Sequence, residues 1–80
     1  MTTILVVDDD QDFAASLGDL ISDQGFDVTL AFNGEDALSA YEQQAFDLVF
    51  MDRKMPRMDG IACILELRKR YPDVRVVMVT

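Results

Sequence analysis

The sequence contains no histidine, a single cysteine and only seven lysine and arginine residues among its 80 positions. Cys63 has no second cysteine with which to form an intrachain disulfide. Without histidine or further cysteines, the usual ligands of a zinc site are also missing. A lone thiol fits a reducing compartment best, so we expect the protein to be cytoplasmic.

Long hydrophobic runs are absent as well. No apolar stretch approaches the roughly 18 residues that a membrane-spanning helix needs, and residues 1–3 carry no basic segment of the kind that opens a secretion signal. We therefore expect a soluble, unsecreted protein with no membrane partner.

Acidic residues outnumber basic residues by fifteen to seven, which gives a formal net charge of −8. This is the wrong sign for attraction to a nucleic-acid backbone or an anionic membrane, so direct nucleic-acid binding is not expected. A cation or a basic partner fits the charge better. Half of the residues are hydrophobic and 28% are charged, which predicts one small globular domain over residues 1–80.

Short apolar and β-branched runs predict strands at residues 4–7, 26–32, 48–51 and 74–79. Helical spacing of apolar residues predicts three helices between them, the first ending at Gly25 and the second opening at Asn33. The third is expected to begin at Asp59 and to end before Pro72. The positions expected to share one face of each helix are Phe13, Leu17, Leu20 and Ile21; Ala37, Leu38 and Tyr41; and Ile61, Ile64, Leu65 and Arg68.

Strands that alternate with helices at this spacing predict an α/β fold with a parallel sheet and helices on both faces. Ligands bind such sheets at the carboxyl ends of the strands. The polar residues expected there are Asp8, Asp9 and Asp10 after the first strand, Asp52 after the third and Thr80 after the fourth. If the first and third strands are neighbours, as in the flavodoxin-like order, Asp8 and Asp9 face Asp52.

Clustered carboxylates repel one another unless a cation compensates their charge. Oxygen ligands without histidine or thiolate select magnesium, manganese or calcium, and Mg²⁺ is favoured because it is commonly held by one or two carboxylates, waters and a phosphate. An aspartate beside such a metal can attack a phosphoryl group, and a threonine hydroxyl can bond a phosphoryl oxygen.

Three segments carry a resemblance to a known family: ILVVDDD at residues 4–10, LVFMDRKMPRMDG at residues 48–60 and VVMVT at residues 76–80. Together they resemble the receiver domain of two-component response regulators, over the whole chain and in the same order. The resemblance implies a flavodoxin-like (CheY-like) parallel sheet with the strand order 2-1-3-4.

The resemblance also implies roles for individual residues. Asp52 would accept a phosphoryl group from a histidine kinase, and Asp8, Asp9, Asp52 and the backbone carbonyl of Lys54 would bind Mg²⁺. Thr80 matches the hydroxyl residue that responds to phosphorylation. Such a module is no enzyme beyond self-catalysed phosphotransfer and dephosphorylation, and it controls an output domain, which is not expected within these residues.

The family pattern continues past this threonine with a further helix, a fifth strand that ends in a lysine, and a last helix. The resemblance therefore implies that residues 1–80 are the N-terminal part of a receiver domain. The fourth strand is then expected at a bare sheet edge, and because exposed apolar edges recruit other chains, we expect either a longer chain or a homo-oligomer formed through this edge.

Three alternatives are open at this point. Asp8, Asp10, Asp12 and Asp19 imitate the oxygen spacing of an EF-hand, but Phe13 replaces the required glycine. Asp8 and Asp10 with Thr80 imitate an aspartate-nucleophile phosphatase, which leaves Asp52 unexplained. The last alternative is an unphosphorylated interaction module that dimerises through its sheet.

Overall fold

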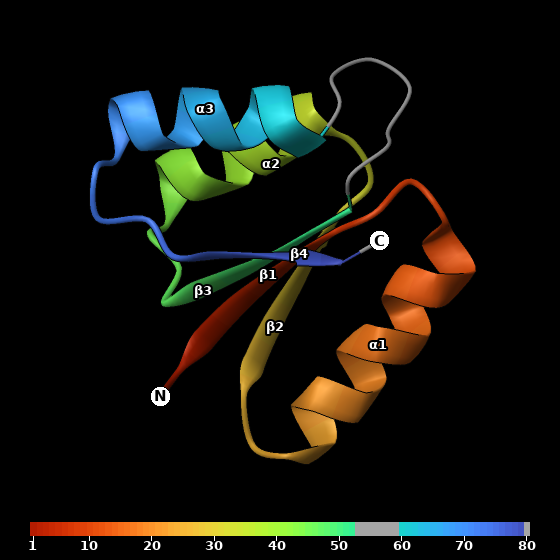
Figure 1. Cartoon of the computed structure of the whole chain (residues 1–80). Helices are drawn as coiled ribbons and strands as arrows, with labels where there is room; N and C mark the ends of the chain where they lie inside the picture. The colour runs from red at the N-terminus through yellow and green to blue at the C-terminus, as the bar shows by residue number, and fades with distance from the viewer. Residues whose placement is uncertain (53–59, 80) are drawn as a thin grey trace.

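A computed structural model describes residues 1–52 and 60–79, which form a four-stranded parallel sheet and three helices (Figure 1). In their order across the sheet, the strands are β2 (Asp27–Ala31), β1 (Thr3–Val7), β3 (Leu48–Asp52) and β4 (Val76–Val79). This arrangement confirms the predicted flavodoxin-like (CheY-like) order 2-1-3-4.

Strand β1 occupies the middle of the sheet and pairs in parallel with β2 on one side and β3 on the other. Leu5, for example, is aligned with Thr29 of β2 and with Val49 of β3. The side chains of residues 4–7 are at most 4% exposed, as expected for a uniformly apolar strand covered on both faces.

Two strands are shorter than predicted. β2 excludes Phe26 and Phe32, the two apolar residues at the ends of the predicted segment. β4 excludes Val74, because the backbone N–H of Val74 donates to the carbonyl of Tyr71 in a turn and is not available to the sheet. Val74 is nevertheless buried in the core.

Helix α1 (Gln11–Asp23) covers one face of the sheet, and helices α2 (Gly34–Gln43) and α3 (Gly60–Arg70) cover the other (Figure 1). Alternate residues of β1 serve the two faces, since side chains along a strand point to opposite sides. Ile4 and Val6 pack toward α1, whereas Leu5 and Val7 belong to the larger cluster beneath α2 and α3. The prediction of helices on both faces is therefore confirmed.

The predicted apolar face of α1 is partly wrong. Phe13 and Leu20 are 44% and 62% exposed, whereas Ala14 and Gly18 are buried. Small residues allow the helix to lie close to the sheet: a Cβ atom at Gly18 would come within 3.0 Å of the Leu30 side chain. Leu17 and Ile21, the other two predicted positions, do pack against the core, so the packed face of α1 combines part of the predicted stripe with small residues.

The predicted apolar face of α3 is also rotated. Ile61 and Leu65 are 49% and 65% exposed, while Cys63 and Leu67 are fully buried. Cys63 lies against α2, and its thiol donates to the backbone carbonyl of Gly34 over 3.7 Å. The predicted start of this helix, Asp59, lies outside the described residues.

For α2, the predicted positions Ala37, Leu38 and Tyr41 are all buried, together with Gly34 at the start of the helix. Asn33 caps its first turn by accepting the backbone N–H of Asp36 at 2.8 Å. At the end of α1, Gly25 has φ 95°, which is the left-handed conformation predicted for it.

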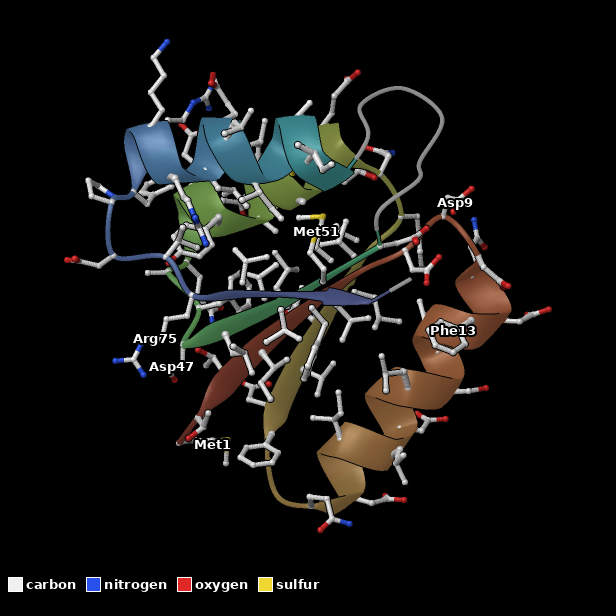
Figure 2. The ribbon with its side chains drawn as sticks, in the orientation of Figure 1. Met1, Asp9, Phe13, Asp47, Met51 and Arg75 are labelled. Atoms are coloured by element: carbon white, nitrogen blue, oxygen red, sulfur yellow. The ribbon has the colours of Figure 1, made fainter. Side chains whose placement is uncertain are left out.

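The amino ends of β1 and β3 are joined by Thr3 and Asp47. The Asp47 carboxylate accepts the backbone N–H of Thr3 at 2.8 Å and its hydroxyl at 3.2 Å, and the backbone N–H of Asp47 donates to the carbonyl of Thr3 at 2.9 Å. Figure 2 labels Asp47 beside Arg75 at this end of the sheet.

Among the described residues, no helix has the length and apolar character needed to cross a membrane.

Candidate functional site

Three carboxylates meet at the carboxyl end of the sheet. Asp8 and Asp9 follow β1 directly, and Asp52 is the last residue of β3. Each offers an oxygen atom, and these atoms lie within 4.8 Å of one another. They meet because β1 and β3 are neighbours with Val7 aligned to Met51, so the residues that follow emerge at the same edge.

The backbone at Asp8 is fixed by its neighbours on both sides. Its N–H donates to the carbonyl of Ala31 at 3.0 Å, which extends the pairing of β1 with β2 by one residue. One oxygen of its carboxylate accepts the N–H of Asp10 at 3.0 Å. The Asp8 side chain is therefore held in place before any ligand binds.

Asp8 is only 9% exposed. Burial raises the pKa of its carboxyl group above the ordinary value, and the nearby carboxylates of Asp52 and Asp9 raise it further. The hydrogen bond from the Asp10 N–H acts in the opposite direction but does not prevail. The site therefore disfavours its own negative charge, which is the electrostatic condition that a bound cation relieves.

The three successive aspartates after β1 have different surroundings. Asp8 is mostly buried, and Asp9 is exposed; Figure 2 labels Asp9 where the chain passes from β1 toward α1. Asp10 is the N-cap of α1, and its carboxylate accepts the backbone N–H of Phe13 at 3.1 Å.

These surroundings bear on the alternatives. Asp12 and Asp19 lie on α1 and not in a loop, so the EF-hand alternative is wrong. Asp10, which a phosphatase-like site requires, is not part of the carboxylate cluster and instead stabilises the helix start. Asp52, which such a site leaves unexplained, is part of the cluster.

The cluster suits a hard divalent cation. All three ligand atoms are carboxylate oxygens, which Mg²⁺ and Ca²⁺ prefer, and Mg²⁺ commonly keeps waters or takes phosphate oxygens beside one or two carboxylates. Asp9 is exposed, so the cluster is accessible to such further ligands. The two remaining predicted members of the site, Lys54 and Thr80, lie outside the described residues.

One feature near this site was not predicted from the sequence: the hydrogen bond by which the Asp10 N–H orients the Asp8 carboxylate. The same acidic run supplies both Asp8 and Asp9 of the cluster and Asp10, the N-cap of α1.

Comparison with known proteins agrees with this geometry. Residues 4–80 match the family described as response regulator receiver domain. The transcriptional regulatory protein ZraR of Salmonella typhimurium is 40% identical over 77 residues, which cover 96% of this chain and 18% of ZraR. The sensory transduction protein RegX3 of Mycolicibacterium smegmatis is 36% identical over 80 residues, which cover the whole chain and 35% of RegX3.

Solved structures give the same result. The response regulator protein TrrA from Thermotoga maritima, crystallised with Mg²⁺ and BeF, superposes with a TM-score of 0.93 at 33% identity, covering 98% of this chain and 68% of TrrA. The receiver domain of NtrX from Brucella abortus superposes with a TM-score of 0.90 at 39% identity, covering 94% and 64%. With a family match that includes β1, β3 and all three clustered carboxylates, this chain belongs to the response regulator receiver domains of two-component signalling.

Proposed function

We propose that Asp52 is the phosphoacceptor of this receiver domain and that Asp8 and Asp9 help to hold the Mg²⁺ ion that the reaction needs. The observation that carries the proposal is the cluster itself: the carboxylate that ends β3 lies within 4.8 Å of two carboxylates that follow β1. Mg²⁺ bound by TrrA, a relative in fold and sequence, supports the choice of metal.

In the proposed reaction, a carboxylate oxygen of Asp52 attacks the phosphorus of a phosphohistidine on a histidine kinase. The phosphorus–nitrogen bond breaks, its electron pair goes to the imidazole nitrogen, and Asp52 becomes an acyl phosphate. Asp8, Asp9, Asp52 and the backbone carbonyl of Lys54 would hold Mg²⁺. The ion would offset the negative charge that gathers between the phosphoryl oxygens and the carboxylates.

The signal is proposed to reach an output domain through Thr80, whose hydroxyl would bond the phosphoryl group. Phosphorylation would then shift an equilibrium between two arrangements of the surface beyond the site. ZraR is named as a transcriptional regulatory protein and RegX3 as a sensory transduction protein, and this chain spans 18% and 35% of their lengths, which supports an output domain elsewhere in the protein. We further propose that residues 1–80 are the N-terminal part of one receiver domain and that it acts in the cytoplasm.

The edge of β4 is proposed to associate with another strand. Within the described part of the chain, β4 pairs only with β3, and Val77 and Met78 are 43% and 36% exposed. If the protein is a homo-oligomer formed through this edge, light scattering should give a mass above that of a monomer. Val77→Lys should shift the mass toward the monomer, and a monomeric wild-type protein contradicts the oligomer.

Mass spectrometry of the intact protein tests the proposed phosphoacceptor. The protein is incubated with Mg²⁺ and a small phosphodonor such as phosphoramidate, and gain of one phosphoryl group is expected. Asp52→Asn should abolish the gain, and chelation of Mg²⁺ should suppress it. The matched control is Asp12→Asn, which removes one exposed carboxylate from α1 and should leave the gain unchanged. Gain that persists in Asp52→Asn but disappears in Asp8→Asn would favour the phosphatase-like alternative.

A further inference from the structure

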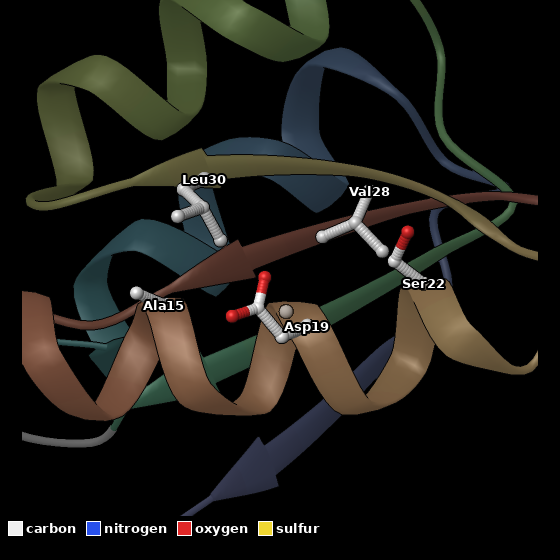
Figure 3. Close-up of a pocket in the computed structure, with 6 residues that line it drawn as sticks. Ala15, Asp19, Ser22, Val28 and Leu30 are labelled. Carbon is white, nitrogen blue, oxygen red and sulfur yellow. The ribbon is translucent and has the colours of Figure 1, made fainter.

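A groove of about 200 Å³ lies between α1 and β2, and none of its lining residues belongs to the carboxylate cluster. Figure 3 shows α1 in the lower part of the view, with Val28 and Leu30 of β2 above the helix. The lining residues are Ala15, Gly18, Asp19, Ser22, Val28 and Leu30.

The apolar wall of the groove is made by Val28 and Leu30, and Gly18 lets α1 lie directly against it. A Cβ atom at Gly18 would lie 3.0 Å from Cδ2 of Leu30 and 3.4 Å from Cγ1 of Val28, so the helix and the strand are in contact at this point and the open part of the groove lies beside it. Val28 and Leu30 are only partly buried, and they present methyl groups to the groove. The groove therefore offers an apolar surface that the described part of the chain leaves open.

The polar part of the groove is a carboxylate without a cation. Figure 3 shows the carboxylate of Asp19 rising from α1 toward Leu30 and Val28, with the Ser22 hydroxyl one turn further along. Within residues 1–52 and 60–79, neither side chain makes a hydrogen bond or an ion pair.

The first 52 residues contain no lysine or arginine, and α1 carries Asp12 and Asp23 besides Asp19. The negative charge of this helix favours a positively charged group of a partner.

We propose that this groove receives an arginine side chain from a partner protein. The aliphatic stem would pack on the partly exposed side chains of Val28 and Leu30, since long cationic side chains bury their stems along apolar surface. The guanidinium would donate to the Asp19 carboxylate and to the Ser22 hydroxyl oxygen. Arginine fits better than lysine because its planar group can donate to a carboxylate and a second acceptor at once.

The size of the groove identifies the guest as one side chain of a larger surface. Pockets for independent small molecules usually hold about 300 to 1,000 Å³, and this one holds about 200 Å³. Arginines are frequent anchors of protein interfaces. The proposal does not depend on phosphorylation of Asp52, so the two can fail separately.

Amide NMR shifts of the full chain test the proposal, with a short blocked peptide that carries a central arginine between two valines as the probe. The shifts should move at Gly18, Ser22, Val28 and Leu30. Asp19→Asn, or citrulline in place of arginine, should weaken binding roughly tenfold to hundredfold, as expected for loss of a charge-assisted hydrogen bond. Gly18→Ala should weaken binding as well, and its unfolding curve shows whether the fold is kept.

Asp12→Asn is the matched control, because it removes the same charge from an exposed position of α1 outside the groove. It should change the affinity by less than about twofold. Equal weakening by Asp12→Asn and Asp19→Asn would overturn the proposal in favour of unspecific attraction. Unchanged binding of the citrulline peptide would also overturn it. So would binding of N-acetylarginine amide as tight as that of the peptide, which would indicate a site for a free small molecule. Self-association of the protein at the groove without peptide would overturn it in favour of a second copy of the chain.

Discussion

An oxygen of the Asp8 carboxylate lies within 4.8 Å of an oxygen of Asp52, although Asp8 is only 9% exposed. Burial is the largest of the causes that raise the pKa of Asp8, and the neighbouring carboxylates raise it further. The folded protein therefore binds the proton of Asp8 more tightly than the unfolded chain does. Keeping Asp8 ionised lowers the free energy of unfolding, and a cation in the cluster recovers that loss.

We predict that Asp8→Asn stabilises the metal-free protein by about 1 kcal/mol at pH 7, in line with substitutions that remove a functional strain. Asparagine keeps an oxygen that can accept the Asp10 N–H and removes the charge. Because the folded-state pKa is raised, the penalty is present above that pKa and absent below the ordinary value of 3.8. Urea unfolding at neutral and acidic pH in a chelator should show the difference only at neutral pH.

The same variant should lose its response to the metal. Mg²⁺ should raise the unfolding free energy of the wild-type protein, since a ligand stabilises the state that binds it, and should leave Asp8→Asn unchanged. Asp12→Asn controls for the general effect of removing one negative charge. If the metal-free Asp8→Asn variant is less stable than the Asp12→Asn variant, the ionised Asp8 carboxylate does not lower the free energy of unfolding as we expect.

The contact between Asp47 and Thr3 predicts an opposite dependence on pH. Hydrogen bonds from the backbone N–H and the hydroxyl of Thr3 lower the pKa of Asp47. Its contribution to stability is therefore complete above the ordinary pKa of 3.8 and is lost as the pH falls through the lowered value. Asp47→Asn should unfold at lower urea concentration than the wild-type protein at pH 7, and the two curves should converge in acid.

Asp19→Asn is the comparison for this effect, because Asp19 is exposed and makes no hydrogen bond or ion pair with other described residues. It should unfold no more easily than the wild-type protein. Equal destabilisation by the two variants would show that loss of charge, and not loss of the contact with Thr3, is the cause.

Two leucines of α3 should respond very differently to truncation. Leu67 is fully buried in the main core, whereas Leu65 is 65% exposed. Leu67→Ala should lower the unfolding free energy by about 2 to 5 kcal/mol, through lost burial and a cavity. Leu65→Ala should change it by no more than about 0.5 kcal/mol. Denaturant unfolding measures both changes. A larger loss of unfolding free energy in Leu65→Ala than in Leu67→Ala would contradict the packing of α3.

The Cys63 thiol should be inert in the folded protein. Burial raises its pKa to about 11, and its side chain is 0% exposed. A disulfide reagent at pH 8 should therefore modify it at least about a hundredfold more slowly than in urea, because the thiolate is the reactive form. The unfolded chain ionises first, so stability should also decline as the pH rises above the ordinary value of 9.0. Cys63→Ala should weaken that decline; the part that remains comes from Tyr41, whose pKa burial raises above the ordinary value of 10.0.

The strand order was implied by the resemblance to receiver domains, and with that order the acidic cluster follows from strong, local patterns. Uniformly apolar runs end in carboxylates at Asp8 and Asp52, and parallel strands bring such ends to one edge. The faces of α1 and α3 were harder to predict, because each helix carries more than one apolar stripe at helical spacing. The stripe that packs contains Gly18 in one helix and Cys63 in the other, and small residues give a weak hydrophobic signal.

Contacts between distant residues could not be predicted at all from local patterns. Asp47 and Thr3 are 44 positions apart, and their contact depends on the register of β1 against β3. The groove beside Gly18 likewise depends on the distance between α1 and β2, which no segment of the sequence encodes alone.

The central place of β1 also sets the order in which a nascent chain can fold. Both partners of β1 are parallel strands, so neither pairing can form as a simple hairpin. β2 becomes available once Ala31 has been synthesised, but β3 is complete only at Asp52. At typical synthesis rates, Asp52 follows Asp8 by about two to nine seconds. If Asp8, Asp9 and Asp52 hold a cation as proposed, a ribosome-bound chain carries only Asp8 and Asp9 of that site for seconds. The cation would then stabilise the pairing of β1 with β3 but not the pairing of β1 with β2.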